Sequence, residues 1–217
     1  MNAHTFTFAG NSFVALESGG LFWPEKRLLC VSDLHLGKAE RLARRGGPAL
    51  PPYETRDTLN KLGDDIHRTD ATTIVCLGDS FDDTAAATAL PENEKLALFG
   101  LMAGRQWIWI EGNHDPEPVE LGGTHLSEFQ IGGLNFRHIA EPAKTGEISG
   151  HYHPKVRLRS ATKRAFLFDS ARLILPAYGT YTGGLRSDDR VLQDLMGTDA
   201  MAILVTSPPL RVPMPRI

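Results

Sequence analysis

Histidine, aspartate and asparagine residues recur in this sequence directly after runs of apolar residues. The segments LLCVSDLH, TIVCLGD, IWIEGNHD and GLNFRH all end in such residues, and GHYH supplies two more histidines. Imidazole, carboxylate and amide groups bind Mn²⁺, Fe or Zn²⁺, and no cysteine belongs to the set. The pattern therefore favours a metal site. The candidate ligands are Asp33, His35, Asp79, Asn113, His138, His151 and His153.

Seven ligands are too many for one ion, so the set predicts two divalent cations that share a bridging carboxylate. Two such ions, roughly 3.5–4 Å apart, orient a phosphoryl group, lower the pKa of bound water and stabilise developing negative charge. The oxygen donors favour Mn²⁺, while Fe and Zn²⁺ stay open as alternatives. The chemistry that this predicts is hydrolysis of a phosphate ester.

Each segment has a simpler interpretation when it is taken alone. An aspartate such as Asp33 after a strand is more often a turn former or a helix cap. GHYH could be a solvated turn, and a lone His138 is more often structural. Because four segments end β-like runs in the same way, we expect their ligands to meet at the carboxyl ends of sheet strands. In extended backbone, Asp33 would project to the same side as His35, and His151 to the same side as His153.

The elements that must position these residues can be read from hydropathy. Short strands are expected in the first 30 residues, and helices over 38–45, 53–69 and 91–104. The continuous apolar runs TIVCLGD and QWIWIEGNHD indicate strands buried on both faces, and Trp107 and Trp109 are expected in the core. The second half contains mainly strands. This order predicts an α/β fold in which two mixed sheets are flanked by helices, in one domain over residues 1–217.

Composition excludes several classes of protein. The formal net charge is −3, so no global positive field would recruit nucleic acid, and any contact would need a local basic patch. Cys30 and Cys76 lie inside apolar runs and are expected to be buried thiols, which weakly favours a cytoplasmic location. No apolar run approaches 18 residues, and the first ten residues lack the pattern of a secretory signal, so no membrane association is expected.

The segments DLHLG, GDSFDD, GNHD and GHYH together resemble the blocks of the calcineurin-like metallophosphoesterase superfamily. These blocks span residues 33–153, and the resemblance implies a four-layer sandwich and a dinuclear centre. AERLARRGGPALPPYETRDTL and LPAYGTYTGGL further resemble the bacterial DNA ligase-associated metallophosphoesterases, over nearly the whole chain. That closer resemblance implies a phosphodiesterase, a DNA endonuclease in repair, associated with an ATP-dependent ligase, a helicase and a nuclease. The alternative is a metallophosphatase or a small-molecule (cyclic) nucleotide phosphodiesterase.

The resemblance also implies roles for single residues. Asp33, His35, Asp79 and His153 would hold one ion, and Asp79, Asn113, His138 and His151 the other. His114 would act as a general acid or stabilise the transition state. Asp82 would orient His114 through its carboxylate. The sequence departs from the family pattern at Asp83, where an arginine is frequent, and Asp83 is interpreted as a solvated loop carboxylate.

A basic segment follows the first block. Lys38, Arg41, Arg44 and Arg45 lie directly after two candidate ligands. On a helix, Arg41 shares a face with Arg44 or Arg45, so these arginines could bind the phosphates of a nucleic acid, or simply form a solvated helix face. In YGTYTGG, Tyr178 or Tyr181 could stack on a base, although an ordinary turn is favoured. The arginines are retained as candidate substrate-binding residues.

Overall fold

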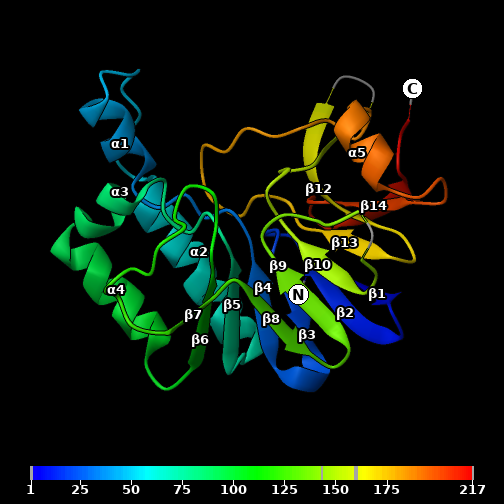
Figure 1. Ribbon diagram of the computed structural model, residues 1–217, viewed down its shortest axis with the longest axis horizontal. Helices are drawn as coiled ribbons and strands as arrows, with labels where there is room; N and C mark the ends of the chain where they lie inside the picture. Colours follow the sequence, from blue (N-terminus) through cyan, green and yellow to red (C-terminus); the bar gives the residue numbers. More distant parts are fainter. Residues whose placement is uncertain (1, 143, 159–160, 217) are drawn as a thin grey trace.

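The computed structural model describes residues 2–142, 144–158 and 161–216, and the strands in these ranges form two mixed sheets (Figure 1). The first sheet runs in the order β1 (Ala3–Phe8), β2 (Asn11–Leu16), β3 (Leu21–Trp23), β4 (Leu28–Val31), β5 (Thr73–Leu77), β6 (Gln106–Ile110) and β7 (Thr124–Leu126). Neighbours pair antiparallel from β1 to β4 and parallel from β4 to β7. The parallel pairing brings the carboxyl ends of β4, β5 and β6 to one edge of this sheet.

The second sheet runs in the order β15 (Leu210–Pro213), β14 (Met201–Leu204), β12 (Ala161–Phe168), β13 (Arg172–Ile174), β10 (Glu147–Ser149), β9 (Leu134–Arg137) and β8 (Glu128–Ile131). The strand β11 (Lys155–Leu158) pairs with the outer part of β12. β10 pairs parallel with both β9 and β13, so these three strands also end at a common edge. The predicted mixture of parallel and antiparallel strands is confirmed in both sheets.

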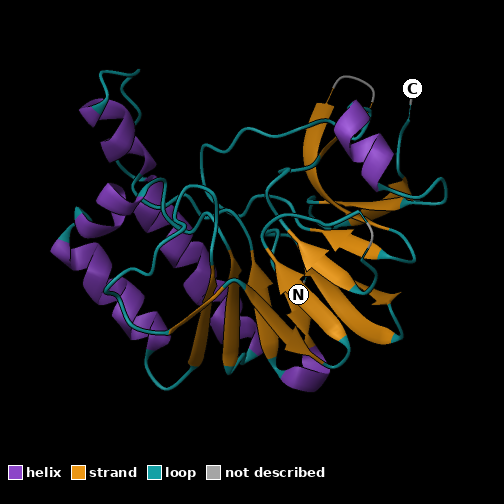
Figure 2. Ribbon diagram, viewed as in Figure 1, coloured by secondary structure: helices purple, strands orange, loops and turns teal. Residues whose placement is uncertain are grey.

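Helices lie outside the two sheets. They are α1 (Lys38–Arg44), α2 (Glu54–Thr69), α3 (Thr84–Thr88), α4 (Glu92–Met102) and α5 (Arg190–Leu195), with a 3₁₀ turn at Pro24–Lys26. Figure 2 shows α2 and α4 beside the first sheet and α5 beside the second. Leu62 and Ile66 of α2 pack on Leu29 and Cys76 of the first sheet. Leu192 of α5 packs in a separate cluster on the second sheet. The predicted four-layer arrangement is confirmed.

The main core lies between the two sheets. Large aromatic side chains fill it from both sides: Phe13 and Trp23 come from the first sheet, and Phe136 and Phe166 from the second. All four are buried. Burial of such rings stabilises the fold by roughly 25 cal/mol for each Å² of apolar surface removed from water. The core therefore fixes the two sheets, and the strand ends of each, relative to one another.

The long helix α2 shows how the sequence sets the outer layer. Leu59, Leu62 and Ile66 recur at helical spacing and are buried, as the periodicity predicts. The helix ends where Asp70 adopts a left-handed conformation with φ of 52°. The short helices α3 and α5 were not predicted, because one or two turns give too little periodicity to read. None of the helices in the described ranges is long and apolar enough to cross a membrane.

Candidate metal centre

The candidate ligands follow the strand ends in loops of unusual backbone conformation. Asp33 and His35 follow β4, Asp79 follows β5, and His151 and His153 follow β10; all have φ between 46° and 70°. The prediction that the two i, i+2 pairs lie in extended backbone is therefore wrong. The turned backbone instead lets neighbouring loops bond to each other, as when the amide of His35 donates to the carbonyl of Asp79 at 2.9 Å. Left-handed conformations of such residues cost energy and gather at functional sites.

Asp33, His35 and His153 form the first cluster. Their candidate ligand atoms lie within 4.8 Å of one another. Oδ2 of Asp33 accepts hydrogen bonds from the Ser32 hydroxyl at 2.6 Å and from the His151 amide at 3.0 Å. These two donors fix the carboxylate, so that Oδ1 faces His153 Nε2 at 3.0 Å.

Asp79, His138 and His151 form the second cluster, with candidate ligand atoms again within 4.8 Å. Nε2 of His138 lies 3.3 Å from Oδ2 of Asp79 and 3.3 Å from Nδ1 of His151. Asn113 joins this cluster, because its Oδ1 lies 3.0 Å from the same His138 nitrogen. The structure thus brings together all seven residues that the sequence singled out, with His151 and His153 in different clusters.

His35, Asp79 and His114 also lie within the same limit and connect the two clusters. Asp79 therefore stands between the clusters, where a bridging carboxylate would be. Its Oδ1 accepts a hydrogen bond from the His114 amide at 2.8 Å.

The donor atoms fit a bound cation. Within the described part of the chain, Asp33 Oδ1, His35 Nε2 and His153 Nε2 are buried and have no hydrogen-bond partner of good geometry. Leaving such atoms unpaired is costly unless a metal uses their lone pairs. On the opposite side of the rings, His138 Nδ1 donates to the Leu77 carbonyl at 2.7 Å, and His35 Nδ1 makes an ion-pair contact of 2.8 Å with Asp82 Oδ1 that lacks good hydrogen-bond geometry. Metal-binding histidines typically hold their second nitrogen in this way.

Comparison with known proteins agrees with this geometry. A family model described as calcineurin-like phosphoesterase matches residues 26–195. The chain belongs to the calcineurin-like phosphoesterase family. Among solved structures, the nuclease MPE of Pseudomonas putida is similar at a TM-score of 0.76 and 25% identity, covering 96% of this chain and 100% of that chain. A search of curated proteins gave no match.

Membership in this family makes the chain a metal-dependent phosphoesterase, a hydrolase of ester bonds. Contacts with histidines keep the two ligand carboxylates of its centre ionised. Burial would raise the pKa of Asp79, but contacts with His138 outweigh burial and lower it. Burial likewise opposes ionisation of Asp33, yet its close contact with His153 lowers the pKa of Asp33 below the ordinary value. Burial would lower the pKa of His138, and its contacts with Asp79 and Asp33 raise it.

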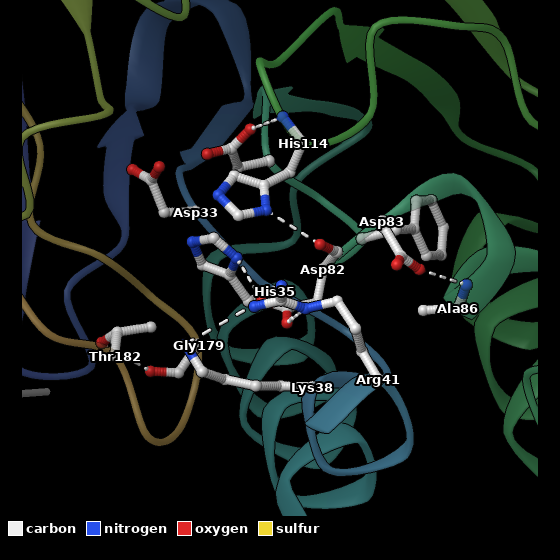
Figure 3. A network of polar contacts seen from close by, with 12 residues as sticks. Asp33, His35, Lys38, Arg41, Asp82, Asp83, Ala86, His114, Gly179 and Thr182 are labelled. Atoms are coloured by element: carbon white, nitrogen blue, oxygen red, sulfur yellow. Dashed lines mark hydrogen bonds and ion pairs between the residues drawn. The ribbon is translucent and has the colours of Figure 1, made fainter. Parts of the chain in front are cut away.

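The phosphoesterase positions His114 differently from the prediction. Nδ1 of His114 lies 2.8 Å from the main-chain carbonyl of Asp82 and must donate to it, because a carbonyl only accepts (Figure 3). The Asp82 carboxylate instead contacts His35 through Oδ1 and Arg41 through Oδ2. The expected contact between this carboxylate and His114 is therefore wrong. The physical reason for the difference is that Arg41 and His35 already occupy the two carboxylate oxygens of Asp82, and charged partners bind a carboxylate strongly.

The basic segment is largely neutralised by neighbouring acids. Arg41 pairs with the buried Asp82, and Arg44 pairs with Glu40 and Asp83. Arg45 lies 3.1 Å from Asp83. The interpretation of Asp83 as a solvated loop carboxylate is wrong, because it also accepts a hydrogen bond from the Ala86 amide and so caps α3. Substrate binding by these arginines stays a prediction.

One supporting residue escaped the sequence reasoning. Asp115 is buried, and its Oδ2 accepts hydrogen bonds from the amides of Ser80 at 2.8 Å and Phe81 at 3.0 Å. It thereby ties the loop after β6 to the loop after β5. Burial raises the pKa of Asp115 to about 6. The signal was present, since GNHD ends in this aspartate, but a carboxylate that binds amides looks the same in sequence as a turn former.

Proposed function

We propose that this phosphoesterase is a Mn²⁺-dependent phosphodiesterase, a DNA endonuclease that acts in repair together with an ATP-dependent ligase. The observation that carries the proposal is the convergence of the seven candidate ligands with His114 in a fold similar to that of a nuclease. We further propose single-stranded or structured DNA as substrate, helicase and nuclease proteins as further partners, one domain over residues 1–217, and a cytoplasmic location.

The residues divide the work as follows. Asp33, His35 and His153 would hold one cation and Asn113, His138 and His151 the other, with Asp79 shared. When bound, the cations supply positive charge that stabilises a reacting phosphoryl group and activates the attacking nucleophile. The oxygen and imidazole donors favour Mn²⁺.

His114 would serve the leaving group. The Nδ1–H group of His114 donates a hydrogen bond to the Asp82 carbonyl, which leaves Nε2 for proton exchange with the substrate. In its protonated form, His114 would give the Nε2 proton to the leaving oxygen as the bond between phosphorus and that oxygen breaks. A positioned general acid of this kind contributes roughly 10²–10⁴-fold in rate.

A cleavage assay tests the proposal. Protein loaded with Mn²⁺ is incubated with DNA hairpins, single-stranded DNA, a simple phosphodiester and a simple phosphomonoester. We expect cleavage of the DNA and the diester, and loss of both activities in Asp79→Asn. Asp188→Asn is the matched control, because it removes a carboxylate that pairs with Arg186 at the surface. Intact DNA after incubation with the loaded protein would contradict the nuclease assignment.

The second candidate is a metallophosphatase or a small-molecule (cyclic) nucleotide phosphodiesterase. It is favoured by the pairing of Arg44 and Arg45 with acids, because neutralised arginines attract a polyanion weakly. The same assay, with a cyclic nucleotide added to the substrates, separates the candidates: a strong preference for the monoester, or for the cyclic nucleotide over DNA, would favour this second function.

A further inference from the structure

The segment 175–185 forms a strap beside the metal centre. The strap enters from β13, and its amides at Tyr178 and Gly179 donate to the carbonyls of Ser32 at 2.7 Å and Asp33 at 3.1 Å. It therefore pairs with the backbone that carries Asp33, a candidate ligand. A side chain at Gly179 would place its Cβ 2.0 Å from the carbonyl oxygen of Leu34, so the close approach requires glycine.

The far end of the strap meets the segment that carries His153. Gly184 has φ of 141°, and a Cβ there would lie 2.0 Å from the His153 carbonyl oxygen. The Leu185 amide donates to the Tyr152 carbonyl at 3.1 Å. Between the two ends, the Thr182 hydroxyl donates to the Gly179 carbonyl at 3.2 Å (Figure 3). The strap thus contacts both segments of the first cluster, at Asp33 and at His153.

Two cationic side chains donate to main-chain carbonyls of the strap. Arg164 of β12 donates to the Ala177 carbonyl at 2.8 Å. The ammonium of Lys61, on α2, donates to the Tyr178 carbonyl and also lies 4.1 Å from the centre of the Tyr178 ring. These carbonyls would otherwise need partners of their own, since the strap forms no regular sheet there.

The side chain of Tyr178 is also bound at its hydroxyl group. Its ring is fully buried, and its hydroxyl donates to Asp65 Oδ2 at 2.8 Å. Asp65 lies four residues after Lys61, one turn further along α2, and is itself held by Ser18 and Arg68. Lys61 and Asp65, one turn apart on α2, therefore bind the carbonyl and the hydroxyl of Tyr178.

Lys61 is only partly exposed, and withdrawing its ammonium from water is costly. Burial, together with the nearby Arg164, lowers the pKa of Lys61 to about 7, while Asp65 and Asp57 oppose that shift. A methionine would fill the same space without the cost of desolvating a charge. A partly desolvated ammonium that donates to a carbonyl of the strap is explained if the position of the strap matters for the neighbouring metal centre.

We propose that Lys61 and Asp65 are positioning residues for the first metal cluster. Acting through Tyr178, they set the strap against the backbone of Asp33, and so set where Asp33 and His153 present their ligand atoms. Neither residue touches the candidate ligands. This inference rests on the metal centre of the proposed function but is independent of the substrate.

Metal binding measures this directly. Metal-free protein is titrated with Mn²⁺ by calorimetry, and Asp33→Asn and Asn113→Ala assign the two binding steps to the two clusters. We expect Lys61→Met to weaken the ion at the Asp33 cluster about tenfold and to leave the other within about twofold. Amide hydrogen exchange at Tyr178 and Gly179 should become faster in the same variant.

Lys95→Met is the matched control, because Lys95 also donates to a main-chain carbonyl, that of Thr88, far along the chain from the strap. If Lys61→Met lowers only the melting temperature and binds both ions like the control, the role is structural and the inference fails. Should Lys61→Met not fold, Tyr178→Phe decides by the same titration, since it keeps the ring and removes only the bond to Asp65. Absence of DNA cleavage with an intact titration result would overturn the substrate assignment but not this inference.

Discussion

Replacing Asp82 with asparagine distinguishes the role of its side chain, which contacts His35, from that of its main-chain carbonyl, which contacts His114. The side chain of Asp82 is fully buried and contacts His35, Arg41 and, at 3.9 Å, Lys38. Its main-chain carbonyl, which the replacement keeps, holds His114. Asp82→Asn therefore removes the negative charge behind a candidate metal ligand and leaves the anchor of the candidate general acid in place.

The size of the effect follows from the position of the carboxylate. A carboxylate that holds the second nitrogen of a metal-binding histidine typically contributes 10–100-fold to metal affinity, so we expect a loss of about 1.4–2.7 kcal/mol in Mn²⁺ binding at the His35 cluster. The ion at the His138 cluster should be held as before, because His138 is anchored by the Leu77 carbonyl.

Two measurements check this reasoning. Calorimetric titration with Mn²⁺ reports the affinity of each cluster, and the dependence of rate on pH, at saturating Mn²⁺, reports the titration of His114. Asp83→Asn is the matched control, since the neighbouring carboxylate pairs with Arg44 and does not contact His35. Unchanged Mn²⁺ affinity together with a shifted pH profile would contradict this assignment, because it would mean that the Asp82 carboxylate acts on His114.

Three further predictions concern His114, Asp83 and Lys61. His114→Ala should lower turnover roughly 10²–10⁴-fold with nearly unchanged metal content by elemental analysis, and a loss of metal would make His114 a ligand. Asp83→Ala should lower the free energy of unfolding by about 1 kcal/mol in urea denaturation, because α3 loses its cap, and an unchanged midpoint would contradict this. Burial lowers the pKa of Lys61 from 10.5 to about 7, so between these values the unfolded chain binds more protons and stability rises with pH, by at most about 1.4 kcal/mol for each unit. Lys61→Met should flatten this rise in denaturation curves, and equal slopes in both proteins would show that Lys61 stays charged.

Much of the fold follows from local patterns. The strands β4, β5 and β6 are continuous apolar runs, and α2 buries its periodic leucines, so both could be predicted from periodicity. The gathering of ligands at strand ends follows from the parallel order of these strands. The short helices α3 and α5 have too few turns to show a periodicity, and the three-residue strand β10 is defined by its pairing with β9 and β13, so none of them could be predicted in this way.

The site could be predicted in identity but not in geometry. The ligand residues stand out by type, whereas the left-handed backbone at Asp33 and Asp79 arises from bonds between loops that the sequence does not display. The partner of the Asp82 carboxylate also could not be predicted. The sequence allows His35 or His114, and only the packing of α1 shows that Arg41 lies beside this carboxylate. Lys61 reads in sequence as a solvated lysine on α2, and only the strap reveals its contact.

The central claim is that the two clusters form a dinuclear metal centre. Crystals of the protein soaked in Mn²⁺, measured for anomalous scattering at the manganese edge, test it most directly. We expect two peaks, one among Asp33, His35 and His153 and one among Asn113, His138 and His151, with Asp79 next to both. A single peak, or a peak held by His114 in place of these ligands, would contradict it.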